Sequence, residues 1–99
     1  MRPKGRPKKY RRILKQPRIT RFSPRGRAGR PDEIEMAVEE FEAVRLADYL
    51  GYSQQEAAKS MHISQQTFSR ILKRARRAIA DILVNGKIIK IQGGQYVVS

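Results

Sequence analysis

Apolar side chains in the second half of the chain recur at steps of three and four residues. Such spacing places them on one face of a helix, and the set comprises Phe68, Ile71, Leu72, Ala75, Ile79 and Ile82. The pattern predicts a helix over residues 65–84, about 30 Å long at 1.5 Å per residue. Asn85 and Gly86 follow it and are expected to end it.

A shorter helical pattern precedes this helix, over residues 54–60. Ser53 and Ser64 each stand just before a helical pattern, where a hydroxyl can cap free backbone N–H groups. Glu56 follows Ser53 by three residues and completes a capping box. Ala57 and Ala58 are small enough for the two helices to cross closely. We expect His62 to take the left-handed turn between them, since His tolerates positive φ better than most residues.

The region before these two helices combines a strand pattern with another helix pattern. Apolar Ile34, Met36 and Val38 alternate with other residues, which favours a strand. Residues 39–50 then change to helical period, with acids in the first turn and Gly51 at the end. Residues 18–22 are expected to form a short edge strand, which tolerates the neighbouring proline.

The C-terminal residues alternate in a way that predicts a β-hairpin, with strands over 87–92 and 95–98 joined at Gly93-Gly94. An isolated hairpin is marginal in water, so we expect it to pair with the earlier strands or with a second subunit. The predicted fold is mainly α: a three-helix helix-turn-helix domain with short β-strands and a C-terminal β-hairpin. We divide the chain into a partly disordered basic arm (1–30), this domain (31–86) and the hairpin (87–99).

Charge is distributed unevenly along the 99 residues. The formal net charge is +13, and residues 1–30 alone hold thirteen Lys or Arg and no acid. Residues 31–99 balance nine bases against nine acids. A polyanion is the expected partner of such a chain. A solvated tail that touches RNA without specificity is the alternative for the arm.

The first twelve residues are too polar to pack and are expected to be disordered when free. They contain a Gly5-Arg6-Pro7 core that resembles an AT-hook, in which an extended backbone enters the narrow minor groove of A·T-rich DNA. The basic residues expected in that groove are Arg2, Lys4, Arg6, Lys8 and Lys9. Gly29-Arg30-Pro31 repeats the core more weakly. A general counterion-releasing tail is the alternative.

The face of the long helix opposite its apolar stripe is polar and basic. Side chains early in a recognition helix usually meet base edges, and those expected to do so are Gln65, Gln66, Ser69, Arg70 and Lys73. Backbone contacts are expected from helix starts and from later arginines, namely Ser53, Ser64, Thr67, Arg74, Arg76 and Arg77. An ordinary amphipathic helix with a solvated basic face is the alternative. The combination of two capped helices and a short turn favours DNA binding.

Several functional classes receive no support from the sequence. The chain has no cysteine, and its single histidine, His62, has no plausible metal partners. It also shows no Ser-His-Asp set and no phosphate-binding glycine loop. No apolar run reaches membrane-spanning length. We therefore expect a cytoplasmic, nucleoid-associated protein that is not an enzyme and has no cofactor, metal or membrane partner.

Four segments carry a resemblance to a known family: EFEAVRLAD (40–48), SQQEAAKSM (53–61), ISQQTFSRIL (63–72), and GKIIKI with the following GG (86–94). Residues 38–94 resemble a prokaryotic family of short proteins predicted to bind DNA, and the basic opening fits that family too. Its helix-turn-helix is similar to that of the C-terminal region of sigma-70 type factors. The resemblance implies DNA binding. Members often carry cysteines near the N-terminus, whereas this chain has none.

The leading hypothesis is a sequence-preferring transcriptional regulator that binds double-stranded DNA as a homodimer. Residues 64–74 would read the major groove, and the basic arm would add minor-groove or phosphate contacts. One alternative is a weakly specific architectural nucleoid protein whose arm dominates binding. Another is RNA binding, although the chain lacks the stacking aromatics typical of single-strand platforms. The sequence assigns no small-molecule effector.

Overall fold

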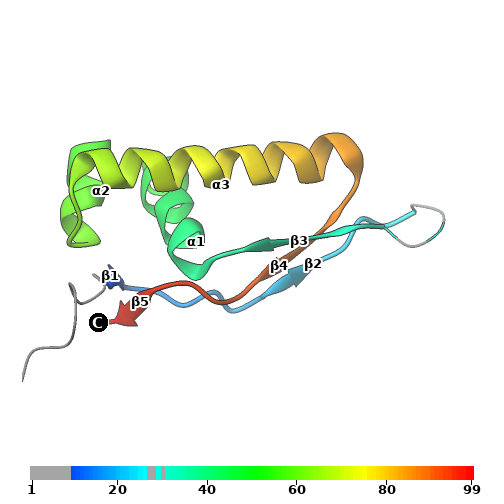
Figure 1. The fold of residues 1–99 in the computed structure, drawn as a ribbon, viewed down its shortest axis with the longest axis horizontal. Coiled ribbons are helices and arrows are strands. Elements are labelled where there is room, and N and C mark those ends of the chain that lie inside the picture. Colours follow the sequence, from blue (N-terminus) through cyan, green and yellow to red (C-terminus); the bar gives the residue numbers. More distant parts are fainter. Residues whose placement is uncertain (1–9, 27–28, 30) are drawn as a thin grey trace, which may run out of the picture.

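The computed structural model describes residues 10–26, 29 and 31–99 (Figure 1). The helices are α1 (Val38–Val44), the π-helical η1 (Arg45–Tyr49), α2 (Gln54–Ser60) and α3 (Gln65–Asn85). The strands are β1 (Arg11–Ile13), β2 (Arg21–Phe22), β3 (Glu33–Met36), β4 (Ile88–Ile91) and β5 (Tyr96–Val98). The predicted fold class is confirmed, with three helical regions, short strands and two strands at the C-terminus.

Helix α3 forms where its apolar spacing predicted it. The Ser64 Oγ accepts the Thr67 N–H at 3.1 Å and caps the first turn. Gly86 ends the helix in the left-handed conformation at φ 63°, and its N–H donates to the Ile82 carbonyl. That conformation favours glycine, because a Cβ would crowd the following carbonyl.

The shorter helix and the turn also match the prediction. Ser53 and Glu56 form a capping box, with the Ser53 Oγ accepting the Glu56 N–H at 3.0 Å and Glu56 Oε1 accepting the Ser53 N–H at 2.9 Å. His62 lies at φ 57° and is the only non-glycine residue with positive φ in the part of the chain that the structure describes. The chain thus turns from α2 into α3 within four residues, 61–64.

The predicted first helix is present but changes geometry along its length. Its regular turns end at Val44, and η1 continues with the wider π-helical repeat. The Leu50 N–H accordingly donates to the Arg45 carbonyl, five residues back, at 2.9 Å. Gly51 follows at φ 79° and turns the chain toward α2. None of the helices in the described ranges is both long and apolar enough to cross a membrane.

The predicted strands form, but the two C-terminal strands do not pair with each other as the predicted hairpin requires. Strand β4 lies between β2 and β3, antiparallel to β2 and parallel to β3, while β5 pairs in parallel with β1. The expectation that the C-terminal strands pair with earlier strands is therefore confirmed. They do not hydrogen-bond to each other as the two arms of a hairpin. The edge strand predicted over residues 18–22 forms only at β2. The strand predicted from residue 34 onward forms only at β3.

The Gly93-Gly94 segment shows why the hairpin does not close. The Gly93 carbonyl accepts the Val38 N–H at 3.0 Å, and the Gln95 N–H donates to the Glu39 carboxylate at 3.1 Å. Gly94 lies at φ 109°, and a Cβ there would collide with the Glu39 carboxylate. These bonds hold the segment against the start of α1 and direct β5 toward β1.

Strand β1 was not predicted, because residues 11 and 12 were assigned to the polar, disordered arm. Arg11 pairs with Tyr96 and Ile13 with Val98, and the Ile13 side chain is fully buried. The hydrogen-bonding partners come from the other end of the chain. Local composition could not reveal such a long-range pairing.

Two apolar clusters make up the core, and α3 contributes to both. One lies between α3 and the other helices: Ala43, Leu46, Ala57, Ala58, Met61, Phe68, Ile71 and Leu72. The other lies between α3, α1 and the strands: Ile13, Met36, Val38, Ala75, Ile89 and Ile91. In Figure 1, α3 runs over α1 and α2 at one end and over β3 and β4 at the other. Its apolar face therefore joins the helices to the sheet.

A buried carboxylate ties the N-terminal segment to α1. Glu42 is fully buried, and its Oε2 accepts the Leu14 N–H at 2.9 Å. The same carboxylate accepts two hydrogen bonds from the Arg45 guanidinium, at 2.8 and 3.0 Å. The hydrogen bonds that Arg45 donates to Glu42 raise the pKa of Arg45. Glu42 thus has both a backbone donor and a charge partner, as a buried carboxylate requires.

Replacing Glu42 is expected to destabilise the fold strongly. Glu42→Ala leaves the Leu14 N–H unsatisfied and Arg45 without its partner, and breaking a buried ion pair typically costs about 3–5 kcal/mol. Urea denaturation followed by circular dichroism measures the loss. The matched control is Glu33→Ala, which removes an ion pair with Arg21 that is exposed on both sides and worth about 0–1 kcal/mol. Equal losses for the two variants would contradict the tethering role of Glu42.

Candidate nucleic-acid interface

The first half of α3 presents a polar face to solvent. Phe68, Ile71, Leu72 and Ala75 are buried, whereas the side chains predicted to read bases are all exposed: Gln65, Gln66, Ser69, Arg70 and Lys73. The first turn contains no acid. The structure therefore brings these five residues together on one surface of one helix. Because the opposite face is buried, that surface has a fixed orientation relative to the domain.

The residues predicted to contact the DNA backbone near the helix starts already cap those helices. Ser64 Oγ donates to Thr67 Oγ1 at 3.0 Å in addition to accepting the Thr67 N–H. Ser53 caps α2. Ser53 and Ser64 are exposed and Thr67 is half-buried. Their hydroxyls thus lie at the N-terminal ends of α2 and α3, where backbone N–H groups favour anions.

The arginines later in α3 differ in what they contact. Arg76 donates to both carboxylate oxygens of Asp48 in η1, at 2.6 and 3.1 Å. Arg74 contacts Glu40 of α1 at 3.4 Å. The Arg76 hydrogen bonds lower the pKa of Asp48 and raise that of Arg76. Both pairs join α3 to the first helical region, so these two arginines have a structural role that the sequence did not indicate.

Acidic side chains border the basic face on the side of β3. A hollow between α3 and β3 brings Lys73, Arg74 and Arg77 near Glu35, Glu40 and Asp81. Hydrogen bonds from Asn85 and Lys87 lower the pKa of Asp81, and the nearby charge of Arg77 acts in the same direction. In the described part of the chain, Arg70 and Lys73 form no ion pair. The exposed face of Gln65, Gln66, Ser69, Arg70 and Lys73, which we call the predicted reading face, thus takes its charge from Arg70 and Lys73.

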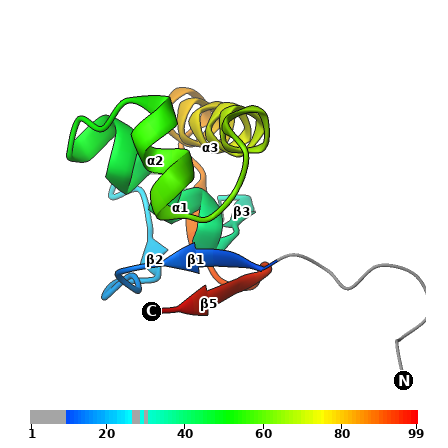
Figure 2. The ribbon, with the colours of Figure 1, turned by 90° about the vertical axis from the view of Figure 1, so that its left-hand side faces the viewer.

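Strand β1 meets the turn between α2 and α3. The Arg12 N–H donates to the Met61 carbonyl at 2.9 Å, and Arg12 Nη1 donates to His62 Nε2 at 2.8 Å. Arg12 therefore lies beside the turn that leads into α3, and Figure 2 shows β1 below α2. Sequence reasoning missed this contact, although His62 had been singled out for its turn. The basic residues predicted for the minor groove, at positions 2–9, lie outside the described residues, as does Arg30.

Comparison with known proteins assigns the chain to a family. The family described as "Protein of unknown function DUF134" matches residues 1–99. This chain belongs to the DUF134 family. It is 51% identical over 92 residues to a "UPF0251 protein" of Caldicellulosiruptor bescii, covering 93% of this chain and 64% of that protein. It therefore spans just under two thirds of that relative.

Other relatives are similar over more of their length. A UPF0251 protein of Thermoanaerobacter pseudethanolicus is 46% identical over 92% of this chain and 78% of its own. One from Methanococcus maripaludis is 48% identical over 94% of this chain and 72% of its own. No solved structure matches the chain. The resemblance found in the sequence is thus confirmed at the level of a prokaryotic family.

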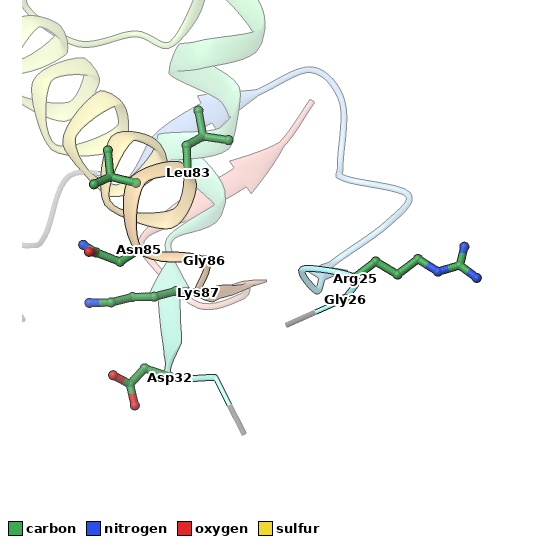
Figure 3. A pocket seen from close by; sticks show the side chains of 8 residues that line it. Arg25, Gly26, Asp32, Leu83, Asn85, Gly86 and Lys87 are labelled. Carbon is green, nitrogen blue, oxygen red and sulfur yellow. The ribbon is translucent and has the colours of Figure 1, made fainter. Parts of the chain in front are cut away.

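One further group of charged side chains in this DUF134 chain lies at the other end of α3. A hollow at the C-terminal end of α3 is lined by Leu83, Lys87, Asp32 and Arg25 among others. Figure 3 shows the Arg25 side chain pointing away from Asp32 and Lys87, so these charges do not converge. Nor do the described ranges contain three or more His, Asp or Glu side chains placed to hold a metal ion.

Proposed function

We propose that this DUF134 protein is a sequence-preferring DNA-binding regulator that reads the major groove through the first half of α3. The observation that carries the proposal is the exposed, acid-free face of Gln65, Gln66, Ser69, Arg70 and Lys73 on a helix whose other face is buried. A rigidly held helix can enter the groove without losing much conformational freedom on binding.

The chemistry of this face suits base edges. Glutamine can donate to and accept from adenine, and arginine can pair with the two acceptors of guanine. Gln66 and Arg70 are one helical turn apart on the same face, so they can reach neighbouring base pairs. Ser69 and Lys73 flank them, and Gln65 starts the helix. We therefore assign the recognition of base edges to these five residues.

Backbone contacts would fix the register of the helix. The N-terminal ends of α2 and α3, capped by Ser53 and Ser64, offer backbone N–H groups and hydroxyls to phosphates. Thr67 lies beside Ser64. Arg77 extends the basic face, whereas Arg74 and Arg76 would have to exchange a carboxylate for a phosphate. Affinity on any duplex should therefore depend on salt.

The basic arm would bind near the same groove. Arg12, the last of the first twelve residues, contacts the turn before α3 through Met61 and His62. Residues 2–9 would then enter the adjacent minor groove or follow the phosphates. Two copies would read two half-sites about one helical turn of DNA apart, as in other dimeric regulators. Such a protein would act on chromosomal DNA in the cytoplasm.

One observation favours a second candidate, a weakly specific architectural protein. Residues 1–30 hold charge equal to the whole net +13, so the arm could dominate binding. In that case affinity would follow phosphate number and A·T content rather than a defined sequence.

Removing a reading side chain should weaken sequence preference. Arg70→Ala and Gln66→Ala are each expected to lose about 1–3 kcal/mol of discrimination between a selected duplex and its scrambled version. Fluorescence anisotropy on both duplexes measures this. Arg25→Ala and Gln16→Ala, exposed and outside α3, are the matched controls. If the α3 variants lose the same amount of affinity for both duplexes, α3 does not determine the sequence preference.

Arg76 allows phosphate contact to be separated from structural support. Its exposed pair with Asp48 is worth about 0–1 kcal/mol, so Arg76→Ala should fold. We expect that variant to weaken binding to all duplexes alike and to lower the salt slope by about one. Asp48→Asn should instead strengthen binding, because it releases Arg76. Loss of affinity in Asp48→Asn to the same degree as in Arg76→Ala would show that the ion pair, and no phosphate contact, matters.

A further inference from the structure

A second surface lies away from the predicted reading face, on the side of α1 where the N-terminal segment crosses it. A groove of about 410 Å³ runs between η1 and the segment that leads into β2. Its apolar lining consists of Ile19, Phe22, Phe41, Tyr49 and Leu50. No residue of α3 lines the groove. The DNA-binding proposal makes no use of the groove.

Four of the five apolar side chains in the lining are exposed to solvent. Tyr49 is 81% exposed, Ile19 56%, Phe22 50% and Leu50 46%. Contiguous apolar surface of this kind marks interaction sites more often than it does ordinary solvent-facing surface. Two of the four are aromatic, the class that most often anchors a protein interface.

The rim of the groove is positively charged. Lys15, Arg18 and Arg45 line it, and no acid does. Lys15 and Arg18 form no ion pair within the described residues, while Arg45 is held by the buried Glu42. A ligand that fills this groove should therefore combine apolar side chains with negative charge.

Charge also decides between possible occupants. A second copy docking the same surface would bring two basic rims together, and five acids of this chain are already paired with its own bases: Glu33, Glu40, Glu42, Asp48 and Asp81. Single-stranded nucleic acid stacks its bases on rows of aromatic faces. Phe22 and Tyr49 offer two exposed aromatic side chains, whereas the likewise exposed Ile19 and Leu50 are aliphatic. A protein segment supplies both apolar anchors and carboxylates.

We propose that the groove between η1 and β2 binds an acidic amphipathic segment of a partner protein. Apolar side chains of the segment, spaced at three and four residues along one helical face, would fill the hollow beside Tyr49 and Phe22. Its carboxylates would meet Lys15 and Arg18. The groove would thus link this protein to a partner without involving the predicted reading face of α3.

The test uses labelled synthetic peptides of about 12 residues, roughly three helical turns, and the full-length protein. One peptide carries Leu and Phe on one helical face and Glu elsewhere. The second has the same composition in scrambled order, and the third replaces Glu with Lys. Anisotropy at about 0.15 M salt, where exposed charges are screened beyond about 8 Å, should show binding of the first peptide, with the other two at least about tenfold weaker.

Groove variants locate the binding. Tyr49→Ser and Phe22→Ser, both at exposed positions, should each lower the affinity for the acidic peptide about tenfold, as expected for an anchor residue. Lys15→Glu with Arg18→Glu should shift preference to the Lys peptide. Leu83→Ser, at a comparably exposed apolar position outside the groove, is the matched control and should have no effect. Thermal melts confirm that all variants fold.

Several outcomes would overturn the proposal. They are equal binding of the ordered and scrambled acidic peptides, absence of binding, and equal affinity for wild type and the Tyr49 and Phe22 variants. Tighter binding of a single-stranded oligonucleotide that the same variants abolish would assign the groove to nucleic acid instead. Light scattering that shows self-association lost in Tyr49→Ser would assign it to a second copy.

Discussion

The apolar face of α3 is the constraint on which the rest of the structure depends. Near its start, Phe68 and Leu72 pack against the other helices, and further along Ala75 and Ile79 pack over the strands. One helix therefore holds together two clusters that would each be small alone. Because both clusters fix its rotation, the opposite face must point to solvent. The same apolar stripe that builds the core thus decides which side chains are available to a partner.

Local signals predicted most of this helical architecture, whereas contacts distant in the sequence were missed. The caps at Ser53 and Ser64, the left-handed His62 and the exposed face of α3 all follow from short patterns. Strand β1 and the pairing of β5 depend on residues more than eighty positions apart, so no window of sequence contains them. The buried Glu42 was also missed, because its partner Leu14 lies in a different part of the chain.

The candidate site could also be predicted only where it depends on local structure. Helical geometry places Gln66, Arg70 and Lys73 on one exposed face, and this could be derived from the sequence. The partners of Arg74 and Arg76 could not, because Glu40 and Asp48 come from a helix whose orientation depends on tertiary packing. Exposed basic residues that look equivalent in the sequence therefore divide into those paired with a carboxylate, such as Arg74 and Arg76, and those without an ion pair in the described residues, such as Arg70 and Lys73. The residues proposed to contact bases are therefore limited to the first turns of α3.

We propose that α3, more than the AT-hook-like residues 2–9, gives this protein its preference among DNA sequences. Selection of bound duplexes from a random pool, carried out in parallel with the full-length protein and with residues 10–99, tests this most directly. We expect one defined motif that survives removal of residues 1–9, with lower overall affinity. Enrichment of A·T-rich duplexes alone, lost when residues 1–9 are removed, would contradict the proposal.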